Sequence, residues 1–360
     1  MSVSLRLVPP PLHLLDAPAP NWSHLLRLSD DTGLLEHARN AIVRREHGYC
    51  VDDVARGLVV ASREPQPGAH VITLAERYLA FVTHATAPDG RVRNRLSYER
   101  RWLDEPDIGD WWGRALWGLG TAAARSTIPW VRREAREAFS VAAQQRSPWA
   151  RAMAFAGLGA AEVLRADPRA GEAAQLLADA ATVIGLPGRD PSWVWPEREL
   201  TYANPALPEV LIHAGDLLGD EPLLADGLRM LGWLCRMQDH DGHLSLVPVG
   251  GWSPGLDRHR FDQQPIEAAA VADACATAAA VTGDDAWDAP LLAAISWFLG
   301  DNDTGSVMYD PQTGGGYDGL TADGPNLNQG AESTLALVAT LQHARTWAGR
   351  GATRPSGGPA

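Results

Sequence analysis

The stretch "WGRALWGLGTAAARSTIPWVRREAREAFSVAA", residues 112–143, contains two helical patterns joined by a short turn. Its first half is rich in Ala, Gly and Leu, so this helix is apolar nearly all round, as expected of an inner helix. Its second half places apolar residues three and four apart among charged ones, which is typical of an amphipathic outer helix. The stretch therefore predicts a hairpin made of one inner and one outer helix.

The same hairpin pattern repeats along the whole chain. Inner helices are predicted near residues 52–64, 109–125, 148–166, 204–218, 262–282 and 329–348, and outer helices near 69–86, 129–143, 168–184, 222–238 and 284–300. The last inner helix has no outer partner after it, but "NWSHLLRL" and "GLLEHARNA" near the N-terminus could supply one and close a ring. We therefore predict an all-α fold, an (α/α)6 toroid with its long loops on one rim; an open solenoid of helix pairs is the alternative.

The ends of the chain differ from this helical body. Residues 1–20 form a proline-rich lead-in that lacks the basic region and apolar core of a signal peptide. We expect one domain over residues 21–348 and a disordered tail over 349–360. No uninterrupted apolar stretch approaches the length of a membrane span, so no transmembrane helix is expected.

Composition limits the partners and cofactors. The chain has a formal net charge of −13, which argues against nucleic acid and anionic membranes as main partners. Cys50, Cys235 and Cys275 form no zinc-binding pattern, and their odd number suggests reduced thiols in the cytoplasm. The Gly-rich "TGGGYDG" lacks the preceding strand of a nucleotide-binding turn. We therefore expect no metal and no cofactor.

Carboxylates gather where the inner helices are predicted to begin. If every long loop leads into an inner helix, the N-termini of these helices face one rim. Glu267 and Glu332 lie about one turn inside apolar helices, which is costly unless they face a polar cleft. Cleavage of a glycosidic bond needs a carboxylic acid and a second carboxylate. The catalytic candidates are Asp53, Asp110, Glu197, Glu267 and Glu332.

Aromatic and amide side chains accompany these carboxylates, and this combination suits carbohydrate. A sugar ring stacks on an aromatic face and offers its hydroxyl groups to Asp, Asn and Gln. Asp52 and Asp262 could equally be helix caps. Trp117 is interpreted as core packing, and His213 and His343 as satisfied core histidines. The substrate-binding candidates are Tyr49, Asp52, Trp111, Trp112, Trp149, Trp195, Tyr202, Asn204, Asp262, Gln263, Gln264, Asn328 and Gln329.

Several motifs resemble a bacterial family of six-hairpin glycosidase-like proteins. They are, in order, "DDTGLLEHA", "REHGYCVDDVAR", "RNRLSYERRWLDE", "GRALWGLG", "FDQQPIEAAAVADAC", "FLGDND", "YDPQTGGGYDGL" and "NQGAESTLA". Members are often labelled glycosyltransferases, and they occur alone, fused to glycosyltransferases, or encoded beside mannoside phosphorylases. The resemblance covers about residues 30–348. It implies an (α/α)6 barrel, a glycan substrate that contains mannose, and a glycosyltransferase as partner.

The family motifs match particular positions of this chain. Matches fall on Asp52, Asp53, Asp110, Trp195, Glu197, Asp262, Gln263, Gln264, Glu267, Asn328, Gln329 and Glu332. The chain departs from the pattern at Val54 and Ala203, where relatives tend to have Asn and Asp. It also departs at Trp111 and Trp112, where relatives tend to have Ser and His. These departures remove polar groups from the expected rim, which implies a changed subsite or a loss of activity.

The leading hypothesis is a glycoside hydrolase that acts on an oligosaccharide in an acidic, Trp-lined cleft. A phosphorylase on the same fold is an alternative. A sugar epimerase ranks lower because that chemistry usually employs histidines, and the predicted rim shows carboxylates instead. A non-catalytic glycan-binding partner of a glycosyltransferase is the hypothesis from a different class.

Overall fold

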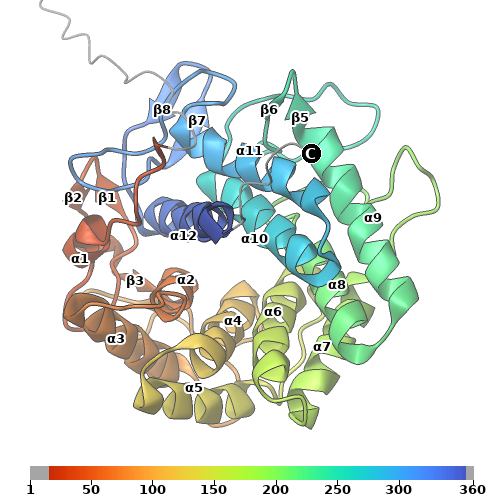
Figure 1. Ribbon diagram of the computed structural model, residues 1–360. Helices are drawn as coiled ribbons and strands as arrows, with labels where there is room; N and C mark the ends of the chain where they lie inside the picture. Colours follow the sequence, from red (N-terminus) through yellow and green to blue (C-terminus); the bar gives the residue numbers. More distant parts are fainter. Residues whose placement is uncertain (1–15, 354–360) are drawn as a thin grey trace, which may run out of the picture.

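The computed structural model describes residues 16–353, and the side chains of residues 16–349. Six inner helices surround an axis and six outer helices cover them, as Figure 1 shows from one end. The inner helices are α2 (Val51–Ser62), α4 (Asp110–Arg125), α6 (Ala150–Ala166), α8 (Ala206–Leu218), α10 (Pro265–Thr282) and α12 (Ala331–Thr353). The outer helices are α1 (Ser23–Leu28), α3 (Ala69–Ala85), α5 (Pro129–Ala142), α7 (Gly171–Ile184), α9 (Glu221–Gln238) and α11 (Asp288–Leu299). The predicted (α/α)6 toroid is confirmed.

Glycines allow neighbouring inner helices to approach closely. A Cβ atom added to Gly120 of α4 would lie 2.2 Å from the carbonyl oxygen of Gly159 of α6. A Cβ atom added to Gly159 would in turn lie 2.1 Å from the carbonyl oxygen of Leu116. The Ala- and Gly-rich composition that marks these helices as inner helices therefore also sets the distance between them.

The N-terminal segment closes the ring, though with less helix than the sequence suggests. "NWSHLLRL" forms the short helix α1, whose Leu25 and Leu28 are fully buried. His24 of this helix lies 2.8 Å from the carbonyl oxygen of Gln329, just before α12. "GLLEHARNA" is not helical: it contains β1 (Ala38–Arg39), which pairs with β2 (Ile42–Val43). Only the first of the two segments therefore serves as an outer helix.

Two-stranded antiparallel sheets stiffen the long loops that lead into four inner helices. β3 (Tyr49–Cys50) pairs with β4 (Arg95–Leu96), β5 (Asp239–His240) with β6 (His243–Leu244), and β7 (Gly319–Thr321) with β8 (Gly324–Asn326). Two short 3-10 helices, η2 (Arg45–His47) and η3 (Asp285–Trp287), complete the elements of the described residues. The inner helices thus begin beneath ordered loops on one rim.

The predicted domain boundaries fall close to the edges of the described chain. Residues 1–15 of the predicted lead-in and residues 354–360 of the predicted tail lie outside the described residues. Helix α12 continues to Thr353, past residue 348 where the domain was predicted to end. Among the described helices, α10 alone is long and apolar enough to suit a membrane, with a mean hydropathy of 1.2. It is an inner helix of the ring and more than half buried, as a core helix should be.

Candidate active site

The rim of the ring contains a polar cavity of about 410 Å³. It lies where the first turns of α2, α4 and α12 meet the residues that precede α10. Its side chains alternate in charge, with carboxylates beside guanidinium groups. The lining residues are Glu36, His37, Cys50, Asp52, Asp53, Arg56, Arg95, Asp110, Arg114, Gln264, Asp318, Gly330, Glu332 and Ser333.

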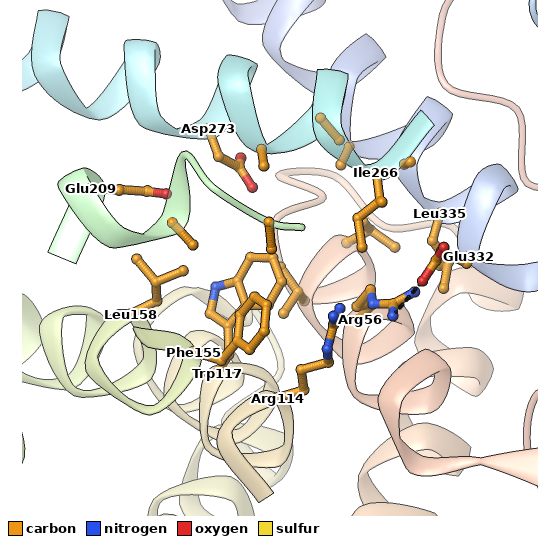
Figure 2. Close-up of a pocket in the computed structure, with 18 of the residues that line it drawn as sticks. Arg56, Arg114, Trp117, Phe155, Leu158, Glu209, Ile266, Asp273, Glu332 and Leu335 are labelled. Atoms are coloured by element: carbon orange, nitrogen blue, oxygen red, sulfur yellow. Dashed lines mark ion pairs between the residues drawn. The ribbon is translucent and has the colours of Figure 1, made fainter. Parts of the chain in front are cut away.

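Arg56 joins two of the predicted catalytic carboxylates. Its Nη1 donates a hydrogen bond of 2.9 Å to Asp53 Oδ1, one turn earlier on α2. Its Nη2 lies 2.7 Å from Glu332 Oε2 on α12, the ion pair drawn in Figure 2. Asp53 is 4% exposed, whereas the Glu332 side chain is 37% exposed. One buried guanidinium therefore holds a buried and an accessible carboxylate close together.

The environments of these two carboxylates shift their pKa values in opposite directions. Burial raises the pKa of Asp53 to about 7; Arg56 opposes the shift and the charge of Glu332 adds to it. Burial also raises the pKa of Glu332, but the guanidinium groups of Arg56 and Arg114 outweigh it and hold this pKa below its usual value. Near neutral pH the pair therefore offers a proton donor and an ionised carboxylate, the combination that acid and base catalysis requires.

A second arginine, Arg114, forms an ion pair with Asp52, the residue before Asp53. Arg114 of α4 is buried, and its Nε lies 3.0 Å from Asp52 Oδ1. Its guanidinium also lies 4.1 Å from the ring centroid of Phe155. Asp52 does not cap its helix, since the residue at the N-cap position of α2 is Cys50. Asp52 therefore belongs to the charged network of the rim cavity, and the capping interpretation is wrong.

Asp110 lines the rim cavity and contacts the exposed aromatic residue Tyr202. Tyr202 donates a hydrogen bond of 2.5 Å to Asp110 Oδ2 from its hydroxyl group. Burial and this carboxylate raise the pKa of Tyr202. Tyr202 is 42% exposed, and the Arg151 guanidinium lies 5.6 Å from its ring centroid. Trp149, which precedes α6, is 64% exposed, and the binding roles of both residues stay predictions.

Glu197 serves the loop before α8 rather than the rim cavity. Both of its carboxylate oxygens accept hydrogen bonds from Arg151 Nη1, at 2.8 and 2.7 Å. Arg151 also donates to Thr201 Oγ1 and to Asn204 Oδ1. This pairing with Arg151 anchors the loop before α8, and the catalytic role of Glu197 stays a prediction.

Glu267 is a positioning residue in the structure. It is 3% exposed, does not line the rim cavity, and accepts a hydrogen bond from the backbone N–H of Ala203. Burial raises the pKa of Glu267 to about 7, against the opposing effect of this hydrogen bond. Glu267 therefore fixes the chain before α8 to the first turn of α10, and its catalytic role stays a prediction.

Several predicted substrate-binding residues are buried and bonded within the protein. Trp112 is fully buried because its ring points to the outer helix α5, where its Nε1 donates to the carbonyl oxygen of Ala142 at 3.1 Å. Gln263 accepts a hydrogen bond from Trp297 Nε1 at 2.9 Å. These side chains are enclosed in this structure, and their role in binding a sugar stays a prediction. The enclosed residues are Tyr49, Trp112, Trp195, Asn204, Gln263 and Gln329.

The other predicted binding residues lie near the rim, and they differ in how exposed their side chains are. Gln264 lines the rim cavity and Asp262 is exposed. Trp111 is half-buried and donates to the carbonyl oxygen of Val92 at 2.7 Å. Asn328 accepts a hydrogen bond from the backbone N–H of Asn40 at 2.9 Å. Of these four residues, Gln264 and Asp262 are best placed to meet a ligand.

Arg56 and Arg114, the cationic residues of the site, were not predicted from the sequence. Arg56 lies three residues after Asp53, and Arg114 lies four residues after Asp110, so helical spacing could have identified both. Glu36, within "DDTGLLEHA", forms an ion pair with Arg95 at the same cavity. The departure at Val54 does not affect the rim, because Val54 is fully buried in the core.

One group of side chains has the composition of a metal site. Glu36, Cys50 and Asp53 each offer one ligand atom, and these atoms lie within 4.8 Å of one another. Glu36 and Asp53 are already bound to Arg95 and Arg56. Burial and the nearby carboxylates raise the pKa of the Cys50 thiol, which keeps it protonated. These partners compete with any metal ion for the same atoms.

Comparison with known proteins identifies the fold. No family model and no curated protein sequence matches the chain. A sugar epimerase from a ruminal bacterium superimposes with a TM-score of 0.67 and 14% identity, over 90% of this chain and 95% of the other. Cellobiose 2-epimerase from Bacillus thermoamylovorans gives a TM-score of 0.66 and 11% identity, over 89% and 95%. The GH76 α-mannanase from Bacteroides thetaiotaomicron gives 0.58 and 11% identity, over 84% and 87%.

These neighbours have the (α/α)6 fold, and the chain shares it. The fold that the resemblance implies is therefore confirmed. The matched proteins carry the names of carbohydrate-processing enzymes, both epimerases and glycosidases. At identities between 11% and 14%, the comparison shows the fold alone. The reaction has to be argued from the side chains of the site.

Proposed function

We propose that the protein is a carbohydrate-active enzyme that hydrolyses an oligosaccharide at the rim cavity. In this proposal the protonated Asp53 donates its proton to the glycosidic oxygen. Glu332 either activates a water molecule or attacks the anomeric carbon directly. The observation that carries the proposal is the contact of both carboxylates with Arg56, which places an acid and an ionised carboxylate in one cavity.

The accessible aromatic side chains support a sugar as the substrate. Tyr202 presents a partly exposed ring beside Asp110, and Gln264 lines the same cavity with its amide. Trp149 adds an exposed ring just before α6. Carbohydrates bind to this mixture through stacking and hydrogen bonds. We take mannose-containing oligosaccharides as the first substrate class, since an α-mannanase shares the fold.

A turnover screen tests the proposal. The full chain is incubated with α- and β-linked manno- and gluco-oligosaccharides, with and without phosphate, and the products are separated by chromatography. Asp53→Asn and Glu332→Gln should each lower turnover by about 10²–10⁴-fold, the usual contribution of an acid or base. The matched control is Glu105→Gln, whose side chain is 96% exposed and does not line the cavity. Loss of activity in this control as well would remove the assignment of Asp53 and Glu332.

A sugar epimerase is the second candidate function, because two of the matched structures carry that name. Epimerisation changes one sugar into its stereoisomer without shortening the chain, so the same chromatograms separate it from hydrolysis. Cleavage that requires phosphate would indicate a phosphorylase. Saturable binding without turnover, unchanged in Glu332→Gln, would favour a glycan-binding partner of a glycosyltransferase. The cytoplasmic location and the glycosyltransferase partner stay predictions.

A further inference from the structure

Two of the three cysteines contact each other between neighbouring helices. Cys235 lies on the outer helix α9 and Cys275 on the inner helix α10, 40 positions later in the chain. Their Sγ atoms lie 3.8 Å apart, close to van der Waals contact. All three cysteines are free thiols in the structure. The chain therefore has one close pair of thiols, Cys235 with Cys275, and one single cysteine, Cys50.

The two thiols of the pair differ in how accessible they are. Cys275 is fully buried in the core, whereas Cys235 is half-buried and lines a surface cavity of about 480 Å³ between α9 and α11. Val271, one turn before Cys275 on α10, forms part of the same wall. A small molecule that enters this cavity therefore reaches Cys235 first. Cys275 is then the nearest thiol to the sulfur that has been reached.

The chemistry of the buried thiol supports the same order. The contact with Cys235 and burial hold the pKa of the Cys275 thiol well above its usual value, which keeps this thiol protonated. Thiols react with oxidants as thiolates, so a buried and protonated thiol is slow to react on its own. Cys275 is therefore suited to the second step of an oxidation, after its neighbour has been activated.

Cys50 provides a comparison within the same chain. It is 3% exposed, and its thiol donates a hydrogen bond of 3.2 Å to Asn94 Oδ1. The other two cysteines contact each other instead. Cys50 therefore lacks the neighbouring thiol that a disulfide requires.

We infer that Cys235 and Cys275 form a redox modification site, in which hydrogen peroxide converts the two thiols into an intramolecular disulfide. The Cys235 thiolate attacks one oxygen of the peroxide, the O–O bond breaks, and hydroxide leaves while Cys235 becomes a sulfenic acid. The hydroxide takes up the proton that the Cys235 thiol released. The Cys275 sulfur then attacks the Cys235 sulfur, and the sulfenic oxygen leaves as water with the proton of the Cys275 thiol. Two thiols and one peroxide thus give one disulfide and two water molecules. The sulfurs approach to about 2.05 Å as this bond forms.

The disulfide would join the two ends of a segment that reaches the rim. Between the two cysteines the chain forms the β5–β6 hairpin and passes Gln264, which lines the rim cavity, before α10 begins. Closing this loop restricts the unfolded chain. The oxidised protein should therefore unfold at a temperature several degrees above that of the reduced protein. The inference is independent of the proposed hydrolase, because neither Cys235 nor Cys275 lines the rim cavity.

Mass spectrometry of the full, folded chain tests the inference. The reduced protein is treated with hydrogen peroxide, the remaining thiols are blocked with iodoacetamide in denaturant, and the peptides are mapped without reduction. The expected result is one linked peptide pair that contains Cys235 and Cys275, with Cys50 alkylated. Thermal unfolding of the same samples should show the upward shift, and dithiothreitol should reverse it.

Two variants test the order of the steps. Cys275→Ala removes the second thiol, so the sulfenic acid at Cys235 should accumulate and be trapped by dimedone. In Cys235→Ser the buried Cys275 should oxidise at least about tenfold more slowly than Cys235 does in Cys275→Ala. Cys50→Ala is the matched control and should leave disulfide formation unchanged.

Three results would overturn the inference. They are a folded wild-type chain that forms no Cys235–Cys275 disulfide under peroxide, a disulfide that includes Cys50, and equal rates of oxidation at Cys275 and Cys235 in the two variants. The peptide map of the wild-type chain decides the question by itself if a variant does not fold. Turnover plays no part in these measurements, so failure of the redox site is distinguishable from failure of the proposed hydrolase.

Discussion

Among single residues, Arg56 has the largest influence on the chemistry of the candidate active site. It contacts Asp53 and Glu332 at once, and its guanidinium is itself buried. A buried cation stabilises the ionised form of both carboxylates. At Asp53, which is almost fully enclosed, burial has the larger effect and raises the pKa. At Glu332 the positive charges have the larger effect and lower the pKa. The opposite shifts thus follow from the guanidinium groups around each carboxylate: Arg56 opposes burial at Asp53, whereas Arg56 and Arg114 together outweigh it at Glu332. The proposed roles of acid and base rest on this difference.

Turnover should therefore depend on pH through both carboxylates. Activity should fall above about pH 7 as Asp53 loses its proton, and at low pH as Glu332 gains one. Arg56→Met removes the positive charge and should raise the pKa of Glu332, which moves the acid limb of kcat/KM to higher pH. The measurement is a pH profile of kcat/KM for both proteins. Arg91→Met is the control, since Arg91 is exposed and pairs with Asp89; an acid limb that stays in place in Arg56→Met would contradict the assignment.

Glu267 should make stability depend on pH in the opposite sense to an ordinary salt-bridged carboxylate. In the folded chain it keeps its proton up to about pH 7, whereas an unperturbed glutamate loses it near 4.5. Its stabilising contribution is present below the unfolded pKa and is lost as the pH rises through 7. Glu267→Gln should therefore gain about 2–3 kcal/mol relative to wild type between pH 5 and pH 8.

The free energy of unfolding in urea at the two pH values checks this prediction. Glutamine keeps an acceptor oxygen for the N–H of Ala203, so the hydrogen bond of the loop can survive. Glu105→Gln provides a fully accessible control and should show no such gain. An equal effect of Glu267→Gln at both pH values would mean that Glu267 is ionised throughout.

The sequence predicted part of the site, and the missing part has a physical cause. Asp53 and Glu332 were identifiable because carboxylates near the start of apolar helices need polar surroundings. Arg56 follows from helical spacing and was overlooked. The directions of Trp112 and Glu197 depend on tertiary partners, namely the carbonyl oxygen of Ala142 and the guanidinium of Arg151. No local pattern specifies those contacts.

At the scale of secondary-structure elements, close packing of the inner helices defines the wall of the ring. Gly120 and Gly159 bring the backbones of α4 and α6 together, and a methyl group has no room at either position. Gly120→Ala should therefore destabilise the chain by about 1–3 kcal/mol, the usual effect of overpacking. Chemical denaturation measures this loss.

Gly171→Ala is the matched control for this substitution. Gly171 opens α7 and has no atom within 4 Å of the added Cβ position. Alanine there should be neutral or slightly stabilising, because it restricts the unfolded chain. Similar losses from Gly120→Ala and Gly171→Ala would mean that close approach of α4 and α6 is not what Gly120 provides.

The helices themselves were largely predictable from sequence. The predicted bounds of the inner and outer helices agree with the structure to within a few residues, because breakers such as Gly and Pro punctuate the chain. The failure at "GLLEHARNA" arose because its apolar spacing resembles that of a short helix. In the structure this segment contributes β1, and Leu35 pairs with Tyr49 across an isolated bridge. Pairing with a distant segment decided its conformation, which local spacing cannot reveal.

At the scale of the whole molecule, a single six-residue helix completes the outer ring, while α2 and α12 contact each other directly in the inner ring. Helix α1 covers α12, and its Leu28 is fully buried. Leu28→Ala should destabilise the chain by about 2–5 kcal/mol. Because α12 supplies Glu332, turnover should also become more sensitive to urea in this variant.

Leu26→Ala on the same helix is the control, since Leu26 is 40% exposed. It should change the unfolding free energy by less than about 0.5 kcal/mol. The two variants are compared by urea denaturation, with turnover followed across the same urea range. If Leu28→Ala behaves like Leu26→Ala, the contact of α1 with α12 does not hold the ring closed.

The separation of the packed wall from the rim also bears on how proteins of this fold can diverge. Asp53, Asp110 and Glu332 come from the first turns of three separate helices, whose positions are set by packing far below the rim. A substitution in one long loop can therefore alter one subsite while the others and the framework persist. Successive generations could exchange one reaction for another through such single steps without passing through an unfolded ancestor. This gives a physical reason why one helical ring can underlie both epimerases and glycosidases.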